Sequence, residues 1–155
     1  MRSLLTIVFM LFVFGVFAPA SFAQGAAKTG PDPSTIRDAE LEKDSLHNLE
    51  VARHYYKLKK AYVAAIKRCE EIDAGNPNFA KMDEVLFIAG ESSLRLAENR
   101  GKQKQKAKTP EQLREDARMY LSRLVAGYPN SVFLKAAEAD LQALGGPIAP
   151  ASSKQ

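Results

Sequence analysis

Apolar residues recur at helical spacing along most of this 155-residue chain, and polar residues fill the positions between them. One example is Tyr62, Ala65, Ile66, Cys69 and Ile72. Steps of one and three residues place these side chains on one face of a helix, and no stretch alternates convincingly as a half-buried strand would. We therefore predict an all-α chain of about five helices, joined mostly by short turns into an antiparallel helix-turn-helix array. The predicted helices cover 34–60, 61–73, 79–99, 110–126 and 131–144.

Capping residues mark the ends of these helices. Thr109, Pro110 and Gln112 form the strongest start signal, with a hydroxyl at the N-cap, a proline at the first helical position and a glutamine that closes a capping box. Ser34 or Thr35 is expected to cap the first helix. The stretch 34–145 is therefore predicted to form one helical domain.

The same periodicity predicts which residues are buried. A glycine inside a helix costs about 1 kcal/mol relative to alanine, so we attribute Gly90 to the close approach of a neighbouring helix backbone. The predicted core of the third helix is Met82, Val85, Leu86, Ala89, Ser93 and Leu96, and that of the fourth is Leu113, Ala117, Tyr120, Leu121, Leu124 and Val125. In the last helix it is Phe133, Ala136, Ala137, Leu141 and Leu144.

A segment of the chain is nearly duplicated 52 residues further on. Residues 74–78 read AGNPN, and residues 126–130 read AGYPN. Each copy follows an apolar helical stripe, contains a glycine and a proline that end the helix, and precedes a new helix. Repeated helix-turn-helix units commonly bind other proteins. The upstream positions in register are Ala65 with Ala117, Cys69 with Leu121, and Ile72 with Leu124.

The N-terminus has the layout of a secretory signal peptide. Arg2 precedes an almost wholly apolar run over 4–17, and Ser21 and Ala23 supply the small residues before a cleavage site. An uncleaved membrane anchor is the alternative, but the run is shorter than the roughly 20 residues needed to span a bilayer. We predict that residues 1–23 are removed and that the protein is exported, with no cysteine placed to carry a lipid.

Composition argues against several classes of function. The net charge of +4 is mild and lacks the aromatic and basic surface typical of nucleic-acid binding. Cys69 lies in an apolar stripe and is expected to be a small buried residue, and His47 and His54 lack a supporting catalytic motif. There is no HExxH, no GxSxG, no phosphate loop and no catalytic carboxylate pair. We predict no catalytic, cofactor-binding or metal-binding residues, and no enzyme.

Three segments are predicted to be irregular: a flexible leader at 24–33, a lysine-rich loop at 100–109 and a disordered tail at 146–155. The loop lysines have two open readings. In the first, they belong to a solvent-exposed loop with no binding role. In the second, they contact anionic lipid headgroups as a partial substitute for a lipid anchor. The loop lysines are Lys102, Lys104, Lys106 and Lys108.

The stretch 55–68 (YYKLKKAYVAAIKR) resembles a tetratricopeptide unit. That family ends its first helix with tyrosines and places a proline about twelve residues after a small alanine of the second helix. Ala65 with Pro77, and Ala117 with Pro129, match this spacing. The sequences of segments 51–77 and 120–131 are similar to those of the tetratricopeptide lipoproteins of outer-membrane protein assembly, the BamD/YfiO-like group. The departures are the absent lipid-bearing cysteine, the smaller number of repeats and the longer period.

The resemblance implies a periplasmic scaffold at the inner face of the outer membrane, whose protein partner is the machine that assembles β-barrels. A scaffold for Tol-type or cell-wall maintenance is the alternative, and an envelope enzyme is a third. In such arrays the first helix of each pair lines a concave face that receives a peptide or helix. The residues predicted to face the partner are Glu50, Arg53, His54, Lys57, Glu84, Phe87, Glu91 and Leu94.

Overall fold

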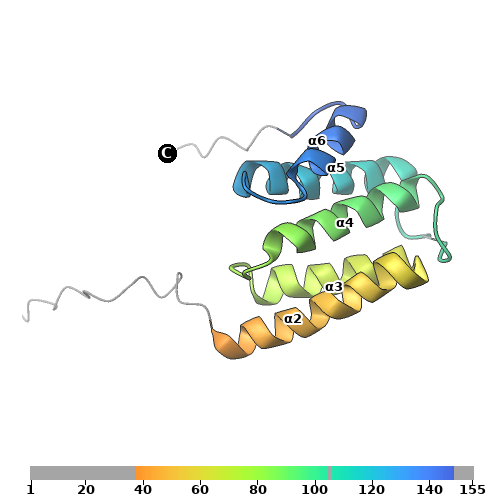
Figure 1. Ribbon diagram of the computed structural model, residues 1–155. Coiled ribbons are helices and arrows are strands. Elements are labelled where there is room, and N and C mark those ends of the chain that lie inside the picture. The colour runs from red at the N-terminus through yellow and green to blue at the C-terminus, as the bar shows by residue number, and fades with distance from the viewer. Residues whose placement is uncertain (1–37, 105, 149–155) are drawn as a thin grey trace, which may run out of the picture. The chain divides into compact units, whose positions relative to one another are not determined.

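The computed structural model describes residues 38–104 and 106–148, and this part of the chain is helical with no strand. The expected signal peptide, the leader and residues 149–155 lie outside it. Figure 1 shows the helices side by side in chain order. The elements are α2 (Ala39–Arg53), the π-helix η2 (His54–Lys59), α3 (Tyr62–Gly75), α4 (Met82–Ala97), α5 (Pro110–Gly127) and α6 (Leu134–Ala143).

The first helix begins later than the sequence predicted. Asp38 is its N-cap, because the backbone is extended there and the carboxylate accepts hydrogen bonds from the amides of Glu40 (2.8 Å) and Leu41 (3.2 Å). Ser34 and Thr35, the caps expected from the sequence, lie outside the described residues. At its other end the helix continues as η2, and Lys60 ends it in a left-handed conformation with φ of 50°.

The sequence repeat is also a repeat of structure. Both α3 and α5 end at a residue with almost the same backbone angles, φ −142° and ψ 74° at Asn76, and φ −133° and ψ 65° at Tyr128. In each copy this cap residue donates its amide to the carbonyl four residues earlier at 2.8 Å. A short turn then leads to a helix that begins 52 residues after its counterpart, α4 at Met82 and α6 at Leu134.

These turns explain why two helices start later than predicted. The amide of Phe79 bonds to the carbonyl of Asn76 at 3.0 Å, and that of Ser131 bonds to Tyr128 at 3.0 Å. The residues expected to begin the third and fifth helices thus belong to turns. The start of α5 agrees with the prediction, because Thr109 accepts from the amide of Gln112 at 3.3 Å and Gln112 accepts from the amide of Thr109 at 2.9 Å.

The core runs through all the helices and is densest around α4. This helix packs against both α3 and α5, and eleven of its sixteen residues are buried. The six residues predicted as its buried face are among them. One prediction is wrong on α6: Ala136 is exposed, because the helix turns Ala137 and Leu141 toward α5 instead. No helix in the described part of the chain has both the length and the apolar character needed to cross a bilayer.

Gly90 allows α4 and α5 to approach each other, although the contact differs from the predicted one. A β-carbon on Gly90 would lie 2.7 Å from Cγ and Cδ2 of Leu121, and 3.5 Å from the carbonyl oxygen of Ala117. The glycine therefore accommodates mainly a side chain of α5, where a helix backbone was expected. Leu121 is fully buried, so it has little room to move away.

Candidate partner-binding surface

An ion pair joins α2 to α4. The guanidinium of Arg53 donates from Nε to Oε1 of Glu84 at 2.6 Å, and its Nη2 donates to the other carboxylate oxygen. The hydrogen bond to Glu84 is the main reason that the pKa of Arg53 is raised, although burial opposes the shift. Both residues were predicted to face a partner. The structure brings them together, and they satisfy each other.

A partly buried polar cluster joins η2 to α4. The hydroxyl of Tyr56 donates to Oε2 of Glu91 at 3.0 Å, and Nε of Arg95 donates to the same oxygen at 2.7 Å. The guanidinium of Arg95 also lies 5.7 Å from the centre of the Tyr56 ring. Burial, followed by the charge of Glu91, raises the pKa of Tyr56 to about 12. Glu91 is only 8% exposed, so this predicted surface residue is committed to internal contacts.

Aromatic stacking joins α4 to the segment that leads into α6. The rings of Phe87 and Phe133 lie 4.7 Å apart between centroids and are almost parallel, at 17°. Beside them, the hydroxyl of Ser131 bonds to the carboxylate of Asp83 at 2.7 Å. Phe87 is half-buried, so the predicted partner residue mainly holds α6 in place.

Of the eight residues predicted to face a partner, the remaining four have freer side chains. Glu50, His54 and Lys57 are exposed on α2 and η2, and Leu94 is half-buried on α4. Among the eight, Leu94 also lines the pocket that is described next. The binding of a partner at any of these residues stays a prediction.

An open pocket of about 530 Å³ lies where α6 ends above α5. Gly145 and Gly146 have φ of 90° and 94°, and they turn the chain away after α6. The carbonyl of Gly146 then accepts from Nε of Arg118 at 2.6 Å, and the amide of Ile148 bonds to the hydroxyl of Ser122 at 2.9 Å. Residues 146–148, which were predicted to belong to a disordered tail, therefore lie against α5.

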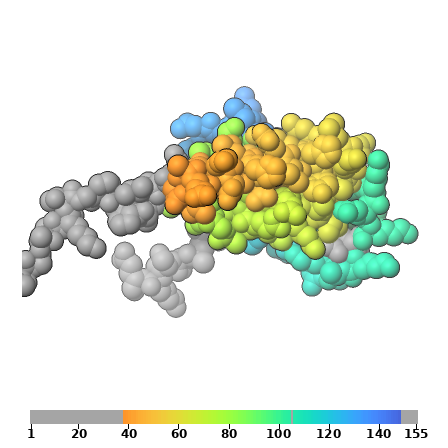
Figure 2. Space-filling model, turned by 90° about the horizontal axis from the view of Figure 1, so that it is seen from below, coloured from red at the N-terminus to blue at the C-terminus, as the bar shows by residue number. Residues whose placement is uncertain are grey.

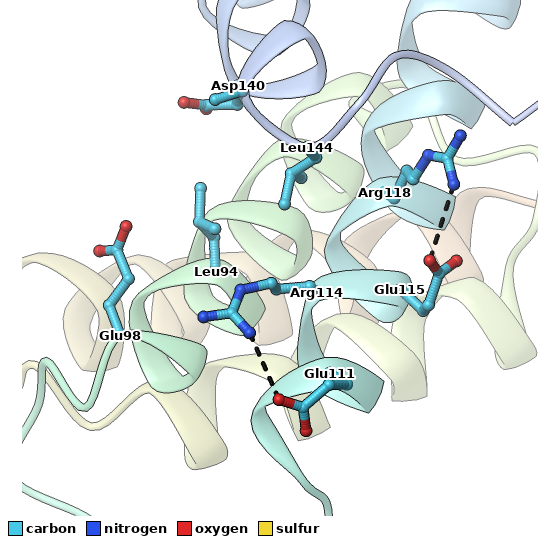
Figure 3. Close-up of a pocket in the computed structure, with 9 residues that line it drawn as sticks. Leu94, Glu98, Glu111, Arg114, Glu115, Arg118, Asp140 and Leu144 are labelled. Carbon is cyan, nitrogen blue, oxygen red and sulfur yellow. Dashed lines mark ion pairs between the residues drawn. The ribbon is translucent and has the colours of Figure 1, made fainter.

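The pocket has apolar residues at its base and mostly acidic groups around it. Figure 3 shows Leu94 and Leu144 between the charged side chains, and two arginines that pair with glutamates three residues earlier on α5. These pairs are long, 3.7 Å for Arg114–Glu111 and 3.6 Å for Arg118–Glu115. The charged lining residues are Glu98, Glu111, Arg114, Glu115, Arg118 and Asp140.

Asp140 has the most perturbed carboxyl group of this pocket. Burial, a hydrogen bond with Glu91 and the charge of Glu91 raise the pKa of Asp140 to about 7. Burial also acts against the charge of Glu91, but hydrogen bonds from Asp140 and Arg95 outweigh it and lower the pKa of Glu91. Of the two carboxyl groups, Glu91 therefore ionises more readily than Asp140.

Leu94 is the only residue of this pocket that the sequence predicted to face a partner, and Leu144 was predicted as a core residue. Glu111 with Arg114, and Glu115 with Arg118, are spaced as pairs on one helix face, which is also the pattern of an ordinary solvated surface. Nothing in the sequence indicates that Asp140 approaches α4. The pocket depends on where α6 stops and how the chain turns afterwards, and these are tertiary features.

Cys69 and the side-chain types that bind metal ions are the remaining candidates for chemistry among the described residues. Cys69 is almost fully buried, and burial raises the pKa of its thiol far above the usual range, so it is an unreactive core residue. No group of three or more histidine, cysteine, aspartate or glutamate side chains within 38–104 and 106–148 is placed to hold a metal ion.

Comparisons with known proteins leave the family open. A scan against models of protein families, a search of curated proteins and a search of solved structures each found no match.

Proposed function

We propose that this protein is a helical scaffold that binds a protein partner. The observation that carries the proposal is the repeat of 52 residues, in which a helix, its cap, the turn and the next helix recur with the same hydrogen bonds. Stacked units of this kind build a continuous core and leave an extended surface for binding, whereas catalysis needs convergent reactive groups. The resemblance of 55–68 to a tetratricopeptide unit supports the same class of protein.

The pocket beside α6 is the proposed place of contact. Leu94 and Leu144 offer an apolar base, and four carboxyl groups outnumber the two arginines around it. Both arginines are already engaged by glutamates or by the carbonyl of Gly146. A complementary partner would insert an apolar side chain and present a lysine or arginine beside it.

The resemblance to the BamD/YfiO-like group supports a narrower proposal. In it, the protein is exported to the periplasm, lies at the inner face of the outer membrane and binds the machine that assembles β-barrels. The test is a pull-down from the cell envelope with tagged residues 24–155 at native expression, followed by mass spectrometry. The tagged protein retains all the described helices.

Charge reversal gives this experiment a matched control. Glu98→Lys with Glu111→Lys changes two exposed acidic residues of the pocket, and Asp44→Lys with Glu138→Lys changes two exposed acidic residues outside it. We expect barrel-assembly proteins with the unchanged protein and the control, and their loss with the pocket variant. Recovery of Tol-type or cell-wall proteins instead would mean that the chain resembles the BamD/YfiO-like group in its repeat unit and not in its partner. Equal retention by both variants would rule out the pocket as the contact.

A further inference from the structure

Two lysine-bearing segments far apart in the sequence meet at one end of the helices. The amide of Lys102 donates to the carbonyl of Lys60 at 3.1 Å, and the amide of Ala64 donates to Oε1 of Gln103 at 3.4 Å. Gly101 fits closely here, since a β-carbon on it would lie 2.8 Å from the ring of Tyr62. In Figure 2 the segment just after 100 lies next to the residues that end η2 and begin α3. The loop is therefore attached to the domain.

These segments bring several lysines to one end of the helices, and we call this positively charged region the lysine end. Its members are all exposed, and none has an ion pair among the described residues. The nearby acidic groups are already paired, Glu98 with Arg100 at 3.2 Å and Asp116 with Lys108 at 2.6 Å. Lys108 is therefore set apart from the other three loop lysines. The lysine end consists of Lys57, Lys59, Lys60, Lys102, Lys104 and Lys106.

An apolar side chain projects from the lysine end. Leu58 lies between Lys57 and Lys59 and is 71% exposed, although leucine is usually buried. It is exposed because η2 changes the helical period and Lys60 then reverses the chain. The nearby Tyr56 and Tyr62 pack against each other, with ring centroids 6.0 Å apart. They are thus unavailable for stacking on bases, which single-stranded nucleic acid would require.

We propose that the lysine end binds the surface of an anionic phospholipid bilayer. Lysines around an exposed leucine match the two components of such a surface, since the ammonium groups reach the phosphates and the leucine enters the boundary of the acyl chains. This role is independent of the pocket at α6 and of the identity of any protein partner. In this proposal the loop lysines act together with the lysines and the leucine at the end of η2.

The test uses residues 24–155, because the apolar stretch before them would bind lipid by itself. Binding to vesicles that contain about a third phosphatidylglycerol is compared with binding to pure phosphatidylcholine, by co-sedimentation at low and at raised salt. The lysine-end variant carries Lys59→Gln, Lys102→Gln and Lys104→Gln. The control carries Lys43→Gln, Lys81→Gln and Lys135→Gln, which remove the same charge from exposed positions elsewhere.

Each lysine near an anionic surface contributes roughly fivefold to partitioning, so the lysine-end variant is expected to bind about a hundredfold more weakly. The control should lose much less, and Leu58→Asn should weaken binding with no change in charge. Circular dichroism of each variant verifies the helices. Equal losses in the two triple variants, full binding by Leu58→Asn, or binding to DNA with none to vesicles would each overturn the proposal.

Discussion

Replacing Gly90 with alanine tests whether Leu121 defines the spacing between α4 and α5. The new β-carbon would lie 2.7 Å from two atoms of Leu121, whereas carbon atoms in contact prefer about 3.5–4.0 Å. Excess volume in a packed core costs about 1–3 kcal/mol. Alanine recovers about 1 kcal/mol of helix propensity. The net expectation is a loss of about 1 kcal/mol in the free energy of unfolding.

Gly127→Ala is the matched control. Gly127 is the last residue of α5, and a β-carbon there would meet nothing within 4 Å. This substitution should raise the free energy of unfolding by about 0.5 kcal/mol. Urea unfolding followed by far-ultraviolet circular dichroism measures both variants.

A double-mutant cycle isolates the contact. In a Leu121→Ala background, which itself costs about 2–5 kcal/mol, the clash is gone and only the gain in helix propensity remains. Gly90→Ala should then stabilise the protein, and the coupling energy should be about 2 kcal/mol. If Gly90→Ala destabilises both backgrounds equally, Leu121 is not the reason for the glycine and the reasoning fails.

Three further substitutions test separate features. Thr109→Ala removes the N-cap of α5 and should cost about 1 kcal/mol in urea unfolding, whereas Thr109→Ser should restore most of it. Ser92→Ala should leave the free energy of unfolding unchanged or raise it, because the fully buried Ser92 hydroxyl has no hydrogen-bond partner among the described residues; a loss above about 1 kcal/mol would reveal an unseen partner. The pKa of Asp140 is raised to about 7, so the folded protein binds its proton more tightly than the unfolded chain and loses stability as pH rises toward 7. Asp140→Asn should therefore have little effect below about pH 4, stabilise the protein increasingly between about pH 4 and pH 7 and have its full effect above that range, and the opposite pH dependence would contradict the raised pKa.

Local signals in the sequence predicted much of the fold. The capping box at Thr109 is a contact within four residues, and the buried stripe that includes Ala65 and Cys69 follows from helical period alone. The boundaries were less predictable, because 79–81 and 131–133 form turns whose hydrogen bonds depend on the preceding cap. The start of α2 shows the same limit, since Asp38 was not expected as a cap and is identified by its extended backbone and the amides that it accepts from.

The candidate site was harder to predict from the sequence than the fold. Helical periodicity shows which residues share a face, but it does not show which helix packs against that face. Glu91 has a charged side chain and was placed on the surface, yet Tyr56 and Arg95 enclose it. Asp140 was missed because its partner lies on another helix. The pairing of distant segments at the lysine end was equally invisible, since Lys60 and Lys102 are brought together by one backbone hydrogen bond.

The correspondence between α4 and α6 in the repeat also limits the addition of further repeat units. Gly90, where α5 packs closely on α4, corresponds to Gln142 of α6, and Leu86 one turn earlier corresponds to Glu138. Both α6 residues are exposed and polar, so α6 lacks the close-packing face that α4 offers its next neighbour. Inserting another copy of the unit after α6 would therefore place a helix on a surface that cannot hold it. An engineer who wished to extend the array would first have to restore a leucine and a glycine at these two positions.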